Sequence, residues 1–269
     1  MLRSLVGSEM CIRDRNKFGP ICAIAFFLGA CANESTSAAD TSSAPTQTET
    51  AELLRPYIDA PTRPANQTVR DQYRRPFETL TFCDVEPTMH VVEIWPGGQG
   101  GWYRRIVEPF ITDNGGEYTP IRSRSNFPGA VDGVASGDAD MVLVFRAHGF
   151  MIYDHPAQDY VNAVFDLLKP GGRLCIVDHA GDESVPQDPK GTNGYVNESH
   201  FRALAQTAGF EFVGASEHNR NPSDTKDHPR GVWSLPPTLA GSEPGSEARA
   251  RFLGIGESDR FAHIYKKPE

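Results

Sequence analysis

Chemically active side chains stand at the ends of two apolar runs in this chain. Arg146 and His148 follow one run, and Asp178 and His179 close the next. Histidine is the natural general base near neutral pH, so we hypothesise that His148 or His179 is a base. Asp178 would orient that base, and Arg146 would bind an anionic group of the substrate. Such residues also often do no more than cap loops, and this alternative stays open.

A glycine-rich turn is the second chemical feature. Residues 96–101 read PGGQGG and directly follow an apolar run. Glycines in such a place let the backbone approach a ligand closely, and the N-terminus of a following helix favours negative groups. The fingerprints GxGxxG and GxxxxGK[ST] are both absent. Glu93, near the end of the run, is placed to accept hydrogen bonds from a cationic or hydroxylated ligand. An ordinary tight turn explains the glycines equally well.

Histidine and cysteine spacing gives no indication of a metal centre. The sequence contains no His-x-His, no His-x-x-x-His and no CxxC pattern. We therefore expect no bound metal, and a metal-dependent hydrolase is the hypothesis with the least support.

Apolar runs and helical periodicities alternate along the chain. Strands are predicted at residues 89–95, 140–145, 173–180, 211–216 and 261–267. Helices are predicted at residues 66–80 with a break near Pro76, at 102–110, at 156–168, and at 200–209 between a Ser199 cap and Gly209. Strands separated by helices indicate an α/β fold in three layers, with a mostly parallel sheet between two layers of helices.

Several segments carry recognisable motifs. VVEIWPGG (91–98), DADMVLVF (138–145) and LLKPGGRLCIVDH (167–179) resemble the first, fourth-strand and fifth-strand motifs of class I S-adenosylmethionine (SAM)-dependent methyltransferases. Residues 74–82, 216–239 and 252–268 resemble a group of bacterial methyltransferases that often carry secretion signals.

This resemblance implies a Rossmann-like sheet of seven strands, with the last strand antiparallel, and SAM as the cofactor. SAM would lie across the carboxyl ends of the first and fourth strands, where Glu93, Gly97, Gly98 and Gly100 would surround its methionine end. The protein would then be an enzyme that methylates a small molecule. The alternative is a non-catalytic envelope lipoprotein that uses the same fold as a binding module.

The stretch between Tyr118 and Asp138 is short for that fold. It must hold a second strand, for which 117–121 is the candidate, and then a helix and a third strand. The second strand should end in an acid that binds the ribose hydroxyls, but none ends 117–121, and Asp132 and Asp138 are poor substitutes. We therefore expect the sheet to be truncated around its second and third strands.

The N-terminal segment resembles an anchoring signal. Residues 1–15 resemble translated sequencing-adapter DNA, and the apolar run 18–30 is too short to span a bilayer. LGAC, which ends at Cys31, is similar to the lipobox of bacterial lipoproteins. A lipid on Cys31 would anchor the protein in the bacterial envelope on the periplasmic side, at the outer membrane.

The expected domains follow from this. Residues 1–31 form the tail and signal peptide, 32–52 form a Ser/Thr-rich linker, and 53–269 form the folded domain.

Composition narrows the possible partners. Of the 269 residues, 39% are hydrophobic and 23% are charged, which excludes a multi-span membrane protein and a wholly disordered chain. The net charge of −9 and the lack of a basic, aromatic-interleaved stretch argue against a nucleic-acid partner. Cys83 and Cys175 could pair, but Cys175 falls in an apolar strand-like run, so we expect both to be small buried hydrophobes. The sequence does not indicate the oligomeric state.

Overall fold

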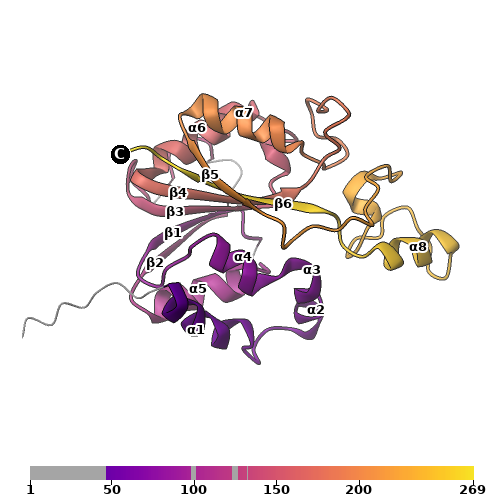
Figure 1. Ribbon diagram of the computed structural model, residues 1–269, viewed down its shortest axis with the longest axis horizontal. Coiled ribbons are helices and arrows are strands. Elements are labelled where there is room, and N and C mark those ends of the chain that lie inside the picture. The colour runs from indigo at the N-terminus through magenta and orange to yellow at the C-terminus, as the bar shows by residue number, and fades with distance from the viewer. Residues whose placement is uncertain (1–46, 98–100, 123–126, 132) are drawn as a thin grey trace, which may run out of the picture. The chain divides into compact units, whose positions relative to one another are not determined.

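One mixed sheet organises the described part of the chain. A computed structural model describes residues 47–97, 101–122, 127–131 and 133–269. Its six strands are ordered β2-β1-β3-β4-β6-β5 (Figure 1). They are β1 (His90–Ile94), β2 (Glu117–Ile121), β3 (Ala139–Phe145), β4 (Leu168–His179), β5 (Glu211–Ser216) and β6 (Arg260–Lys266).

The direction of the strands brings the chemically active segments together. β2, β1, β3 and β4 are parallel, whereas β6 runs antiparallel to both β4 and β5. The chain passes from β1 to β2 on one side and to β3 on the other, so the strand order reverses between β1 and β3. Ligands of open α/β sheets bind beyond the carboxyl ends of the strands at such a switch point.

Helices cover both faces of the sheet (Figure 1). One face carries α1 (Gln47–Ile58), α4 (Pro76–Phe82) and α5 (Arg104–Asp113), and the other carries α6 (Ala157–Leu167) and α7 (Glu198–Ala208). Val91 packs on the α5 side and Val92 on the α6 side, which gives two cores separated by the sheet. The remaining helices are α2 (Ala65–Thr68), α3 (Asp71–Arg74), η1 (His148–Phe150), η2 (Gly231–Ser234) and α8 (Glu247–Ile255).

The predicted three-layer α/β fold is confirmed, and all the predicted strands are present. The predicted helix at 66–80 is divided into α2, α3 and α4. The predicted break near Pro76 is confirmed, because Arg75 adopts a left-handed conformation (φ 42°) immediately before Pro76 and separates α3 from α4. Gly209 ends α7 with φ 100°, as expected. The Ser199 cap is wrong: Asn197 occupies the N-cap position, and the Ser199 hydroxyl donates to Glu183.

The sheet ends at β2 on its far side. No described residue between Ile121 and Ala139 belongs to a helix or a strand. Among the described residues the sheet therefore has six strands, not the seven that the resemblance implies, in agreement with the expected truncation.

The N-terminal boundary differs from the expected one. Helix α1 begins at Gln47, within the predicted linker, and Leu54 and Ile58 are buried in the core on the α5 side. Residues 1–46, including Cys31, lie outside the described residues. No helix in the described part of the chain is both long and apolar enough to span a bilayer.

A disulfide joins Cys83 to Cys175, so the prediction of two unpaired cysteines is wrong. Cys83 follows α4 and Cys175 lies in the middle of β4, and the fold brings their Cα atoms to 5.5 Å across 92 residues of sequence. Both side chains are fully buried, as expected.

Candidate active site

A cavity of about 500 Å³ opens beyond the carboxyl ends of β1, β3 and β4. Ile94 and Gly97 border it from β1, Arg146 from β3 and His179 from β4. Segments distant in sequence close its other sides: residues around α2 and α3, the stretch that contains Trp233, and the start of β6. The cavity therefore lies at the place where the strand order favours a ligand.

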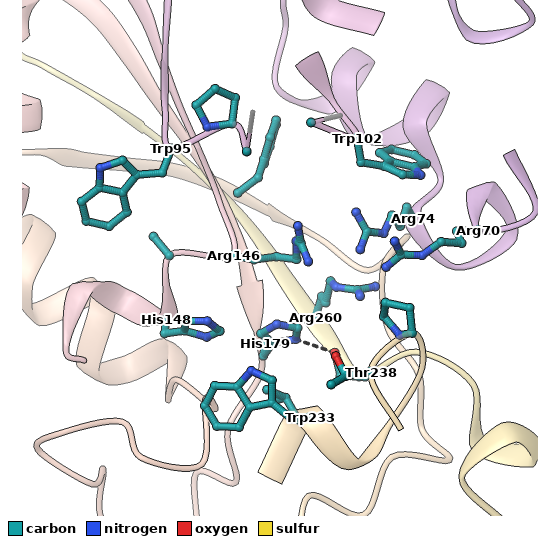
Figure 2. A pocket seen from close by; sticks show the side chains of 18 of the residues that line it. Arg70, Arg74, Trp95, Trp102, Arg146, His148, His179, Trp233, Thr238 and Arg260 are labelled. Atoms are coloured by element: carbon teal, nitrogen blue, oxygen red, sulfur yellow. Dashed lines mark hydrogen bonds between the residues drawn. The ribbon is translucent and has the colours of Figure 1, made fainter. Parts of the chain in front are cut away.

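Three of the four predicted catalytic residues line this cavity, namely Arg146, His148 and His179 (Figure 2). The two imidazole rings stack with centroids 5.5 Å apart and an interplanar angle of 13°. Arg146 and His148 both have positive φ, 61° and 51°, which is uncommon outside glycine. Such backbone persists when the surrounding packing holds it, and it is concentrated at functional sites.

His179 has the environment of a neutral base. Burial, followed by the charges of Arg260 and His148, lowers its pKa well below the usual value for histidine. The ring is therefore uncharged at neutral pH. Its Nδ1 hydrogen bonds with the hydroxyl of Ser258. When Nδ1 carries the ring proton and donates a hydrogen bond to the Ser258 hydroxyl oxygen, Nε2 has a free lone pair.

Asp178 lies behind the cavity wall and does not line the cavity. It is fully buried, and burial raises its pKa. Its two oxygens accept hydrogen bonds from the backbone N–H groups of Gly149 and His179, both at 2.9 Å. The carboxylate thus orients the backbone that carries both histidines.

His148, Asp178 and His179 could hold a metal ion by geometry. Each offers one ligand atom, and the three atoms lie within 4.8 Å of one another. However, the charges of Arg146 and Arg260 act on the same place and already disfavour a proton on His179. A bound cation would meet the same repulsion, so our expectation of no metal stays a prediction.

The glycine-rich turn enters the cavity wall through Gly97 and Gly101. Gly97 has φ 74°, and a Cβ built on Gly101 would lie 2.1 Å from the carbonyl oxygen of Pro96. The turn therefore requires glycine at both positions. Gly98 and Gly100, predicted to contact SAM, lie outside the described residues.

Glu93 is not among the residues that line the cavity. Its side chain is 1% exposed, and Oε2 accepts a hydrogen bond of 2.6 Å from the Tyr118 hydroxyl. Burial raises the pKa of Glu93 to about 7, although the Tyr118 bond and the charge of Arg104 lower it. The predicted role of Glu93 at the methionine end of SAM stays a prediction.

No acid at the end of β2 faces the cavity. Arg122 directly follows the last residue of that strand. Asp138 lies at the opposite end of the sheet, 3.4 Å from Nδ1 of His90 at the start of β1. Asp132 lies outside the described residues. The described residues thus provide no acid at the end of the second strand, where the resemblance places the residue that binds the ribose hydroxyls.

Sequence reasoning missed most of the charge in the cavity. Arg70, Arg74 and Arg260 line it, together with Trp102 and Ser258. Trp233 also lines it, and the centroid of its ring lies 5.6 Å from that of the His148 ring. The motif resemblance of residues 74–82, 216–239 and 252–268 covers Arg74, Trp233 and Arg260, and it does not cover Arg70 or Trp102.

Comparisons with known proteins give a distant likeness of fold. No family model matches the chain, and no curated protein is similar to it in sequence. A SAM-dependent methyltransferase from Aquifex aeolicus is 10% identical, with a TM-score of 0.46 over 80% of this chain and 97% of that one. Geranyl diphosphate C-methyltransferase from Streptomyces coelicolor is 12% identical, with a TM-score of 0.46 over 83% of this chain and 98% of that one. The [4+2]-cyclase SpnF is also 12% identical, with a TM-score of 0.45 over 84% and 97%. Likeness at this level assigns no activity to the chain.

Proposed function

We propose that the protein is a SAM-dependent methyltransferase that acts on a small molecule. The proposal rests on one observation: the three segments that resemble methyltransferase motifs, 91–98, 138–145 and 167–179, all end at the same cavity. They contribute Gly97, Phe145 and His179 to its wall. The bare backbone of Gly97 suits close approach of a cofactor, and the site lies at the switch point of the sheet.

The chain's own part in the chemistry is positioning and proton removal. When bound, SAM supplies an electrophilic methyl group, whose C–S bond breaks as the acceptor's lone pair bonds to the methyl carbon and the sulfur keeps the electron pair. Nε2 of His179 would take the proton that the acceptor releases. His148, stacked on His179 and also in the cavity wall, is the second candidate for this role.

Titration calorimetry of the full chain with SAM and with S-adenosylhomocysteine tests the proposal. We expect micromolar binding of at least one of them. Gly97→Ala should weaken that binding tenfold or more, because a methyl group is added in the cavity wall. Gly115→Ala is the matched control: it has a similar φ of 85°, and nothing lies within 4 Å of its added Cβ. Absence of binding by both nucleosides, or an equal effect of the two variants, would contradict the proposal.

We also infer that the protein works outside the cytoplasm, anchored through Cys31. The Cys83–Cys175 disulfide supports this location, because disulfides persist in oxidising compartments. Labelling of the full chain with a fatty acid in a bacterial host tests it. Label should be lost in Cys31→Ser and kept in Cys22→Ser, and an unlabelled parent chain would refute the anchor. SAM is made in the cytoplasm, so the envelope location and methyl transfer are separate proposals, and the labelling experiment tests only the location.

A further inference from the structure

Four arginines gather on one side of the cavity. Arg70 precedes α3, Arg74 ends it, Arg146 follows β3 and Arg260 begins β6. Figure 2 shows their guanidinium groups directed toward the same part of the cavity. This concentration of positive charge occurs in a chain whose net charge is −9. Burial and the neighbouring arginines lower the pKa of both Arg74 and Arg146.

One carboxylate is shared among three of these arginines. Glu257 is buried and forms ion pairs with Arg70, Arg74 and Arg260, the Nε of Arg74 lying 3.1 Å from its Oε2. No Asp or Glu is among the described residues that line the cavity. Arg146 has no carboxylate within ion-pair distance in the described part of the chain. Within ion-pair distance in the described part of the chain, the four guanidinium groups therefore share one carboxylate, that of Glu257; the buried carboxyls of Glu93 and Asp178 interact with Arg146 only at longer range.

Several guanidinium nitrogens are buried without a hydrogen-bond partner among the described residues. They are Nη2 of Arg70, Nη1 and Nη2 of Arg74, and Nε and Nη1 of Arg260. Arg74 is 1% exposed and Arg260 is 3% exposed. The ring of Trp102, 5.0 Å from Cζ of Arg74, compensates only part of this. Buried charges are otherwise paired, because an unpaired one is costly.

We propose that Arg70, Arg74, Arg146 and Arg260 form a binding subsite for a small polyanion, a molecule with a phosphoryl group or with two or more carboxylates. In the proposed reaction this polyanion is the methyl acceptor. That assignment rests on the proposed function, whereas the anion subsite does not.

The charge balance selects a polyanion over the other possible ligands. A single carboxylate would still leave uncompensated guanidinium groups. SAM does not balance them, because its one carboxylate is offset by its ammonium and sulfonium groups. A metal ion at His148, Asp178 and His179 would add positive charge to the same region. Planar guanidinium donors match phosphate and carboxylate oxygens, often with two hydrogen bonds.

Binding of inorganic phosphate, citrate and acetate to the full chain at constant ionic strength tests the subsite, both by calorimetry and by the shift in Tm. We expect phosphate or citrate to bind and raise Tm, and acetate to bind at least tenfold more weakly. Binding of phosphate alone identifies a phosphoryl ligand, and binding of citrate alone identifies a polycarboxylate. Equal binding of acetate, or no binding of either polyanion, would overturn the proposal.

The variant Arg146→Gln tests whether the polyanion binds in this cavity. Arg146 has no ion pair among the described residues, so its replacement deprives no carboxylate of an ion-pair partner. The variant should therefore fold. We expect polyanion binding about tenfold to a hundredfold weaker, as for the loss of one charge-assisted hydrogen bond. Lys266→Gln, which removes a positive charge at the opposite end of β6, is the control and should bind as the parent chain does. Equal binding by Arg146→Gln and the parent would refute the subsite.

The two proposals can fail separately. Polyanion binding without binding of SAM or S-adenosylhomocysteine would refute the methyltransferase alone. Binding of either nucleoside without polyanion binding would refute only the subsite.

Discussion

The Tyr118 hydroxyl donates a hydrogen bond of 2.6 Å to Oε2 of Glu93, which joins the side chains of two neighbouring parallel strands inside the protein. Glu93 belongs to the segment that resembles the first methyltransferase motif, yet its carboxyl group is directed toward β2 and α5. Burial raises the pKa of Glu93 to about 7, and burial together with Glu93 also raises the pKa of Tyr118. The Glu93 carboxyl therefore titrates near neutral pH, whereas the Tyr118 hydroxyl keeps its proton.

Replacement of Glu93 by Gln should stabilise the protein at alkaline pH. Because the folded-state pKa is raised, the favourable contribution of the neutral acid is fully present below about 4.5 and is lost as the pH rises through about 7. Glutamine is neutral at every pH and can still accept the Tyr118 bond. We expect Glu93→Gln to gain up to about 3 kcal/mol over the parent at pH 8.5 and little at pH 5. Thermal unfolding at both values measures this.

The exposed residue Glu211 provides the control, since Glu211→Gln should change stability little at either pH. If Glu93→Gln is less stable than the parent at pH 8.5, then the carboxylate is charged and favourable in the fold.

The orientation of Glu93 shows why the sequence predicts the strands better than the site. All five residues of β1 are buried, so no hydrophobic alternation indicates which face a given side chain occupies. By contrast, Arg146, His148 and His179 follow or end strands. Because parallel strands end at one edge of the sheet, their convergence on the cavity could be predicted.

The charged wall and the disulfide could not be predicted in this way. Arg74 and Glu257 are separated by 183 residues, and no periodicity relates them. Their pairing, like that of Cys83 with Cys175, depends on how short helices pack against the end or face of the sheet. Only tertiary structure provides this information.

Loss of the Cys83–Cys175 disulfide should destabilise the protein considerably. The bond closes a loop of 92 residues, and loss of a disulfide across such a loop costs about 4.6 kcal/mol in the chain-entropy model. Urea unfolding of the parent with and without reductant measures the effect, and reductant should lower the midpoint. The double variant Cys83→Ala, Cys175→Ala should have a low midpoint that reductant does not change. A parent chain insensitive to reductant during unfolding would contradict the bond.

Replacement of Glu257 by Gln should lower the unfolding free energy at neutral pH and lower it less in acid. Burial raises the pKa of Glu257, but Arg260, Arg74 and Arg70 outweigh burial and lower it to about 2. A lowered pKa gives stability that is present above about 4.5 and lost as the pH falls toward 2. We expect Glu257→Gln to lose about 3 kcal/mol or more at pH 7, because the arginines lose their shared anion.

Unfolding in denaturant at pH 7 and at pH 3 measures this change, and the difference from the parent should shrink at the lower pH. Glu247→Gln, at an exposed position in the first turn of α8, is the control and should change little. An undiminished difference at pH 3 would mean that Glu257 stabilises the fold through shape and not through charge.

Asp224 should be necessary to hold in place the segment that contains Trp233 and forms one wall of the cavity. The buried carboxylate accepts hydrogen bonds from the Tyr195 hydroxyl at 2.8 Å, from Nε2 of His228 at 2.8 Å and from the backbone N–H of Asp259 at 2.8 Å. It thereby ties the loop before η2 to the residues that lead into β6. An asparagine keeps the size of the side chain but turns one acceptor into a donor, which leaves one of these donors unsatisfied.

We expect Asp224→Asn to lose about 2 kcal/mol in unfolding free energy and to speed amide hydrogen exchange in residues 221–238. Asp227→Asn, in the same loop but exposed and hydrogen-bonded to the nearby Thr225 hydroxyl, should change the unfolding free energy by no more than about 0.5 kcal/mol. It should leave hydrogen exchange in residues 221–238 as in the parent. Faster exchange in Asp224→Asn that spreads evenly over the whole domain would contradict the prediction. It would mean that the carboxylate stabilises the entire fold and does not specifically hold this wall of the cavity.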